Sequence, residues 1–143
     1  MDLRTLFFSA EERIGRRTFW IGYAVLMVLN LAFHFINLVG IPDIIGEFLV
    51  LTTLWPQICV EAKRLHDMGR TGWWMAVPAL VGIICITIGF MLGYNETGQA
   101  GHEAIAPLVV AGVCTAIYLL WIGLTPGTSE PNRFGPALKG AGG

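Results

Sequence analysis

The chain has 143 residues, of which 55% are hydrophobic and 13% are charged, and its formal net charge is −1. Its mean hydropathy of +0.64 lies above the range of soluble domains, which argues against a soluble protein and predicts a membrane protein. Three runs without Asp, Glu, Lys or Arg cover residues 18–42, 71–95 and 104–129. Each is longer than the roughly 20 residues that a helix needs to cross the hydrocarbon core of a bilayer.

Residues 1–17 form a mixed N-terminal segment that we expect on the cytoplasmic side or in the interfacial layer of the membrane. Apolar side chains beside Arg4 fit a short segment lying along the lipid headgroups, and a frayed terminus is the alternative. Ser9 and Glu12 have the spacing of a capping box, which predicts the start of a helix there. Three arginines then precede Phe19 and Trp20, the order expected at the cytoplasmic end of a spanning helix.

A first spanning helix is predicted over residues 18–39. Its polar residues Asn30, His34 and Asn37 are spaced i, i+4 and i+7, so they share one face. Exposing amide groups to hydrocarbon is costly, and this face should therefore turn toward other helices or a water-filled crevice. Hydrogen bonding between helices and a ligand or proton pathway are both open.

A second spanning helix is predicted over residues 44–62. Gln57 and Glu61 share a face with Thr53, and Pro56 should kink the helix because it removes one backbone hydrogen bond. The polar stretch that follows is expected to extend this helix beyond the membrane, with Gly69 ending it in a left-handed conformation. Within it, Arg64 and Asp67 are three residues apart and can pair.

A third helix over residues 73–94 and a fourth over residues 104–124 complete the prediction, followed by a cytoplasmic tail at 125–143. Gly89 and Gly93 form a GxxxG pattern, with Gly82 one heptad earlier. Such small residues let helix backbones approach closely, within the protein or at a dimer face. The fold class is therefore an all-α membrane protein, a single domain of four transmembrane helices in a compact bundle with short loops.

The distribution of cations predicts the orientation. With four spans, segments 1–17, 63–72 and 125–143 lie on one side and hold all nine Lys and Arg residues. The opposite loops, 40–43 and 95–103, carry Asp43, Glu96 and Glu103 and no cation. The positive-inside rule then places both termini in the cytoplasm, and the protein in a bacterial inner membrane as a multi-pass protein.

Three blocks of the sequence carry a resemblance to a known family. They are Arg13 to Trp20, Arg64 to Trp74, and Pro126 to Thr128 with Asn132 to Pro136. In this order and spacing they resemble a bacterial inner-membrane family known as domain of unknown function 805. Two positions depart from its pattern: Glu12 stands where the family tends to have Gly, and Ala137 where it tends to have Asp. The resemblance implies a four-helix inner-membrane protein and brings no established reaction with it.

Three classes of function remain. An enzyme is disfavoured, because Glu61, His66 and Asp67 are too few for a metal or acid–base site and no nucleophile or phosphate-loop motif occurs. We expect no catalytic residues, no metal and no cofactor. A membrane adaptor or assembly component is favoured, acting with a second copy or with a membrane-protein partner, in contact with the bilayer and without nucleic acid.

The alternative is binding or transport of a small anionic ligand, a lipid headgroup or an ion. Its sites would be a basic cytoplasmic face and the polar faces of the first two helices. The cytoplasmic candidates are Arg13, Arg16, Arg17, Arg64, His66, Asp67, Arg70, Asn132 and Arg133. The intramembrane candidates are Asn30, His34, Asn37, Gln57 and Glu61.

Overall fold

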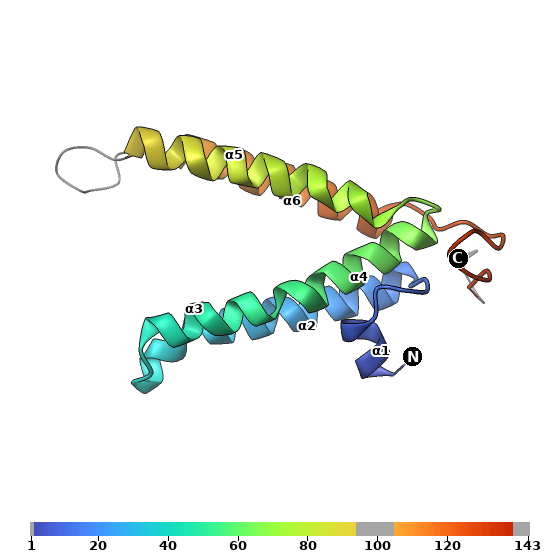
Figure 1. Ribbon diagram of the computed structural model, residues 1–143, viewed down its shortest axis with the longest axis horizontal. Coiled ribbons are helices and arrows are strands. Elements are labelled where there is room, and N and C mark those ends of the chain that lie inside the picture. The colour runs from blue at the N-terminus through green and yellow to red at the C-terminus, as the bar shows by residue number, and fades with distance from the viewer. Residues whose placement is uncertain (1, 94–104, 139–143) are drawn as a thin grey trace. The chain divides into compact units, whose positions relative to one another are not determined.

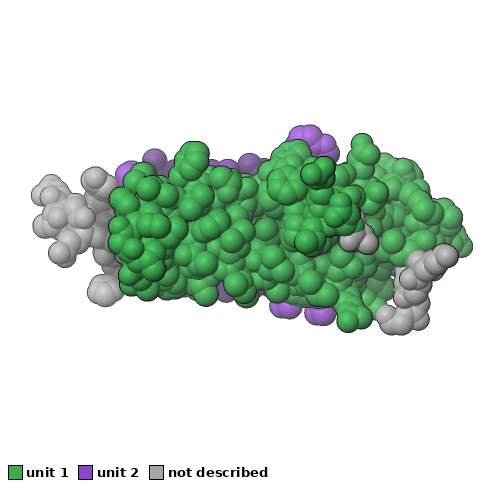
Figure 2. Space-filling model, turned by 90° about the horizontal axis from the view of Figure 1, so that it is seen from below, with its two compact units in different colours: residues 1–72, 125–143 green, residues 73–124 purple. Residues whose placement is uncertain are grey.

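The computed structural model describes residues 2–93 and 105–138 and is all-α over that part of the chain. The chain forms two compact units, which Figure 2 shows in green and purple. The first combines Met1–Gly72 with Thr125–Gly143, and the second is Trp73–Leu124. The predictions of one domain and of a compact four-helix bundle stay predictions.

The first unit is built on a helical hairpin. A short helix, α1 (Leu3–Phe8), precedes the long helix α2 (Arg16–His34) and a 3₁₀ turn, η1 (Ile36–Val39). The chain then returns through α3 (Asp43–Thr52) and α4 (Leu54–Asp67). As Figure 1 shows, α2 lies alongside α3 and α4, while α1 packs on α4. The N-terminal segment therefore contains a short helix, and its expected place in the interfacial layer stays a prediction.

The second predicted helix is interrupted at Thr53, three residues before Pro56. Because Pro56 has no backbone N–H, the Thr52 carbonyl receives no bond from it, and the helix breaks at Thr53 between α3 and α4. The predicted extension past residue 62 is confirmed, since α4 runs to Asp67. Gly69 has a φ of +72°, and the Arg70 amide donates to the Leu65 carbonyl at 2.9 Å. This is the left-handed glycine end predicted from the sequence.

Two predictions for the N-terminal half are wrong. No helix begins at Ser9: its hydroxyl accepts from the Glu11 amide at 3.2 Å, and Glu12 has a φ of 74°, outside the helical region. The chain between α1 and α2 instead runs beside α4, where Ile14 donates to the Lys63 carbonyl at 3.4 Å. The first long helix also occupies residues 16–34 rather than 18–39, and η1 follows it.

The second unit is a pair of packed helices. The 3₁₀ turn η2 (Gly72–Met75) leads into α5 (Ala76–Gly93), which packs against α6 (Ile105–Leu124). The Trp74 and Trp121 rings lie 5.9 Å apart where the pair begins and ends. Of the predicted small-residue stripe, Gly89 is buried, but a Cβ at Gly82 would meet nothing within 4 Å. The predicted loop at 95–103, with Glu96, His102 and Glu103, lies outside the described residues.

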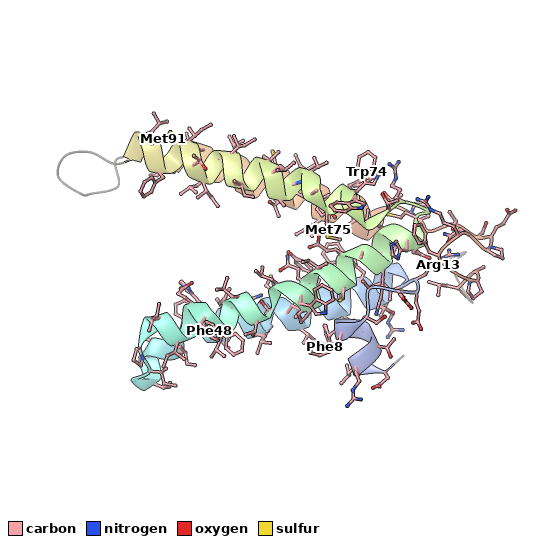
Figure 3. The ribbon with its side chains drawn as sticks, in the orientation of Figure 1. Phe8, Arg13, Phe48, Trp74, Met75 and Met91 are labelled. Carbon is pink, nitrogen blue, oxygen red and sulfur yellow. The ribbon has the colours of Figure 1, made fainter. Side chains whose placement is uncertain are left out.

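Three helical stretches in the described part of the chain are long and apolar enough to cross a membrane: Ile44–Asp67, Gly72–Leu92 and Ile105–Leu124. Their large apolar side chains point outward, as Phe48 on α3 and Met91 on α5 do in Figure 3, with 67% and 75% of their surface exposed. Such outward apolar surface is what a lipid-facing helix presents. α2 is not among the three; it begins with two arginines and carries Asn30 and His34.

Close packing of the hairpin depends on Gly46, and this can be tested. A Cβ there would lie 2.4 Å from the Phe33 carbonyl oxygen and 2.9 Å from an Ile36 methyl group, so the backbone of α2 or that of α3 must shift. We expect Gly46→Ala to destabilise the protein by about 1–3 kcal/mol, measured by thermal unfolding in detergent. Gly112→Ala is the control, because its Cβ would meet nothing within 4 Å. Equal melting temperatures for the two variants would contradict the close packing of α2 on α3.

Candidate functional site

Two buried arginines of the first unit surround one carboxylate, that of Asp67 at the end of α4. Asp67 Oδ1 accepts from Arg13 Nε at 3.1 Å and from Arg13 Nη2 at 3.0 Å. Its other oxygen, Oδ2, accepts from Arg64 Nη1, which confirms the predicted pair between Arg64 and Asp67. All three residues are buried, with 4%, 0% and 1% of Arg13, Arg64 and Asp67 exposed. We call this group the ion-pair cluster.

The cluster joins three segments that are far apart in the sequence. Arg13 comes from the extended chain before α2, and Figure 3 shows it beside the end of α4. Arg64 and Asp67 are on α4 itself, and the tail after α6 closes over them. The Thr128 amide donates to the Asp67 carbonyl oxygen at 2.8 Å. We call segments 9–15, 63–70 and 125–138 together the headpiece.

Two guanidinium groups around one carboxylate leave the buried cluster with an excess positive charge. Backbone carbonyls of the tail compensate it. Arg13 Nη2 donates to the Thr128 carbonyl at 2.6 Å, and Arg13 Nη1 donates to the carbonyls of Glu130 at 3.1 Å and Pro136 at 3.3 Å. Arg64 Nη2 donates to the Thr125 carbonyl. The prolines and glycines of the tail keep it from forming a helix, so these carbonyls are available as acceptors.

Gly127 lies where the tail passes over the Asp67 carboxylate. A Cβ at this position would lie 2.0 Å from Asp67 Oδ2 and 2.5 Å from its carboxyl carbon. Only a residue without a side chain lets the tail pass directly over the carboxylate. The absence of a side chain at Gly127 therefore allows the tail to bury the ion pair.

Lys63 has a separate structural role. Its side chain is fully buried, and its Nζ donates to the carbonyls of Thr5 and, at 3.2 Å, Leu6. These carbonyls belong to the last turn of α1, where unpaired acceptors and the negative end of the helix dipole favour a cation. Lys63 thus fastens α1 to α4.

Asn132 fixes a tight turn at residues 132–135. Its Nδ2 donates to the His66 carbonyl at 2.9 Å and its Oδ1 accepts from the Phe134 amide at 2.9 Å. The turn places the Phe134 ring on the His66 ring, with centroids 3.9 Å apart and planes 6° from parallel. The Arg133 guanidinium carbon lies 4.6 Å from the centroid of the Phe134 ring.

An open pocket of about 360 Å³ lies beside this stack. It is lined by Glu11, Glu12, His66, Arg133 and Phe134. The Nδ1 atom of His66 is buried and has no hydrogen-bond partner among the described residues. Of the pocket residues, the sequence indicated His66 and Arg133; Glu11, Glu12 and Phe134 were missed because no periodicity links the three segments.

The intramembrane candidates pair between and along the helices of the hairpin. The Thr53 hydroxyl donates to Asn30 Oδ1 at 2.8 Å. His34 Nδ1 lies 3.6 Å from Glu47 Oε1. Gln57 Nε2 donates to Glu61 Oε1 at 3.2 Å. The side chain of Asn37 is outside the part of the structure that is described.

The remaining cationic candidates lie outside the buried cluster. Arg17 is exposed at the start of α2 and Arg70 is exposed just beyond α4, while Arg16 is half-buried in the first turn of α2. The expected basic face is therefore divided: Arg13 and Arg64 are buried under the tail and are not open to a ligand. Within residues 2–93 and 105–138, no three His, Cys, Asp or Glu side chains are placed to hold a metal ion.

The ion-pair cluster gives a prediction for stability. Asp67→Ala leaves two guanidinium groups buried without a carboxylate, and we expect a loss of about 3–5 kcal/mol in the free energy of unfolding. Arg64→Ala combined with Asp67→Ala should cost less than the sum of the single changes, because the pair shares one interaction. Chemical or thermal unfolding in detergent measures all three variants. Glu130→Gln is the matched control, since its exposed side chain should change stability by no more than about 0.5 kcal/mol.

Gly127→Ala tests the same cluster without removing a charge. Its Cβ would displace the Asp67 carboxylate, so we expect destabilisation comparable to that of Asp67→Ala. Gly15→Ala is the control, because its Cβ would meet only a Leu138 methyl group, at 3.9 Å. A stable Gly127→Ala protein would show that the tail does not cover the cluster.

Comparisons with known proteins agree with the resemblance noted in the sequence. The chain is 31% identical to a protein of Escherichia coli strain K12 named "Uncharacterized protein YiiR", over 94% of this chain and 89% of that protein. The same figures hold for the protein of that name from Escherichia coli O157:H7. No solved structure gives a significant match. The family model described as "Protein of unknown function (DUF805)" matches residues 7–136, which include the whole ion-pair cluster, and the chain therefore belongs to the DUF805 family.

Proposed function

We propose that the protein crosses a bacterial inner membrane four times, with α2 as the fourth span. α2 has 19 residues, or about 28 Å at 1.5 Å per residue, close to the thickness of the hydrocarbon core. It lies alongside α3 and α4, which together form one of the three candidate spans, so it is expected to cross beside them (Figure 1). The asymmetric distribution of cations supports a cytoplasmic headpiece with both termini on that side.

Within this arrangement we propose a non-enzymatic role, as a membrane adaptor or assembly component. The proposal rests on one observation: the charged side chains best suited to binding or catalysis are bonded to other groups of the same protein. Arg13, Arg64 and Asp67 are bonded to one another and to tail carbonyls, under the tail. Such a cluster holds three chain segments in one fixed arrangement, which suits a surface that another protein recognises.

Ligand binding or transport is the second candidate. The open pocket beside His66 favours binding of a small molecule at the headpiece. Transport along the hairpin has less support, because Asn30 bonds Thr53 and Gln57 bonds Glu61, as in packing between and along helices.

Reporter fusions test the topology. Fusions after residue 143 and within residues 63–70 are expected to report the cytoplasm, and a fusion within residues 95–103 should report the periplasm. The reason is the placement of all nine cations in segments 1–17, 63–72 and 125–143. A periplasmic signal from residues 63–70 would mean that α2 and the α3–α4 stretch do not both cross, and would overturn the four-span proposal.

Photocrosslinking in native membranes tests the adaptor role. A photoreactive phenylalanine replaces Phe8, Phe48 or Trp73, each exposed, or Phe19, which is fully buried and serves as the control. At least one exposed position should give a crosslinked band of defined mass, containing a second copy or another membrane protein, and position 19 should give none. Native mass spectrometry should show an assembly heavier than the 15.6 kDa chain. Lipid adducts alone, together with a monomer mass, would contradict an adaptor.

A further inference from the structure

The pocket at the headpiece is assembled by the ion-pair cluster. Glu12 is next to Arg13 in the sequence, and His66 is next to Asp67. On the tail, Arg133 and Phe134 follow Asn132, whose side chain is bonded to α4 through the His66 carbonyl. Each wall of the pocket therefore neighbours a residue that is fixed in the headpiece. A pocket held in this way is formed before a ligand arrives.

The lining of the pocket carries charges of both signs, the carboxylates of Glu11 and Glu12 and the guanidinium of Arg133. Glu11, Glu12 and Arg133 are all exposed at its wall. Within residues 2–93 and 105–138, neither glutamate forms an ion pair with Arg133. The Arg133 guanidinium instead lies over the Phe134 ring, which leaves its N–H groups able to bind an anion.

A simple anion fits this lining poorly, because two carboxylates would repel it. A simple cation would face Arg133. A molecule with an ammonium group and a phosphate linked by a short chain satisfies both kinds of group at once. Its ammonium can donate to Glu11 and Glu12, its phosphate can accept from Arg133, and its linking carbons can rest on the stacked rings of His66 and Phe134.

We propose that this pocket binds a phosphoethanolamine group. The volume of about 360 Å³ is at the lower end of the range for small-molecule sites and suits a headgroup rather than a whole lipid. The group can come from a lipid headgroup or from soluble glycerophosphoethanolamine. The inference relies on the proposed function only in placing the headpiece at the face of the membrane, where such headgroups are concentrated.

Titration calorimetry of the full-length protein in detergent tests the proposal. Short-chain dihexanoyl lipids carry the phosphoethanolamine, phosphocholine or phosphoglycerol headgroup, and glycerophosphoethanolamine is the soluble arm. We expect the phosphoethanolamine lipid to bind at least tenfold more tightly than the other two. Phosphocholine has no N–H to donate to the glutamates, and phosphoglycerol has no cation. Equal affinity for glycerophosphoethanolamine identifies the soluble group as sufficient, and tighter binding of the lipid identifies the membrane as the source.

Variants assign the binding to the pocket. Glu11→Gln combined with Glu12→Gln, and Arg133→Gln alone, should each weaken phosphoethanolamine binding about tenfold or more. Glu130→Gln and Arg4→Gln are the matched controls, as exposed charges away from the pocket lining, and should bind like the wild type. Unchanged melting temperatures show that the variants are folded. Equal binding of the three lipids, or full binding by the pocket variants, would overturn the proposal. Neither result would alter the fusion or crosslinking results, which test the proposed function separately.

Discussion

The headpiece depends on a single carboxylate shared by two buried guanidinium groups. Asp67 receives Arg13 on one oxygen and Arg64 on the other, and the backbone of the same residue accepts from the Thr128 amide. A buried ion pair is often no more stabilising than well-packed apolar residues of the same size, but removing one member leaves a charge without compensation. The cluster therefore joins the N-terminal segment, α4 and the tail through one shared residue.

The excess positive charge of the cluster also explains how the irregular tail is held in place. Two cations and one anion require further acceptors, and the nearest are carbonyls that take no part in a helix or sheet. The sequence after α6 supplies them, with Pro126, Pro131 and Pro136 preventing a helix and Gly127 allowing close approach. The tail is ordered by the charge it covers, although its composition is that of a loop.

The sequence allowed the prediction of features that depend on periodicity or on neighbouring residues. The long helices, the interruption near Pro56, the left-handed Gly69 and the Arg64–Asp67 pair all follow from spacing within one helix or from one residue's geometry. The partnership of Arg13 with Asp67 could not be predicted, because it joins residues 54 positions apart across an extended segment. Lys63 was interpreted only as a topology signal, and its bond to α1 depends on how that short helix packs.

The cations of α4 have two proposed roles, orienting the hairpin in the membrane and bonding α1 and the tail, and both depend on their position along the helix. Lys63 and Arg64 lie in the last two turns of this helix, where the negative end of the dipole favours them. Both side chains are buried under polypeptide and donate to backbone carbonyls, which satisfies groups that would be costly to expose to hydrocarbon. In the proposed topology, the charges that hold this end of the hairpin in the cytoplasm are the ones that bind α1 and the tail. Insertion of the hairpin would then place segment 63–70 at the cytoplasmic face, and segments 9–15 and 125–138 would pack on it.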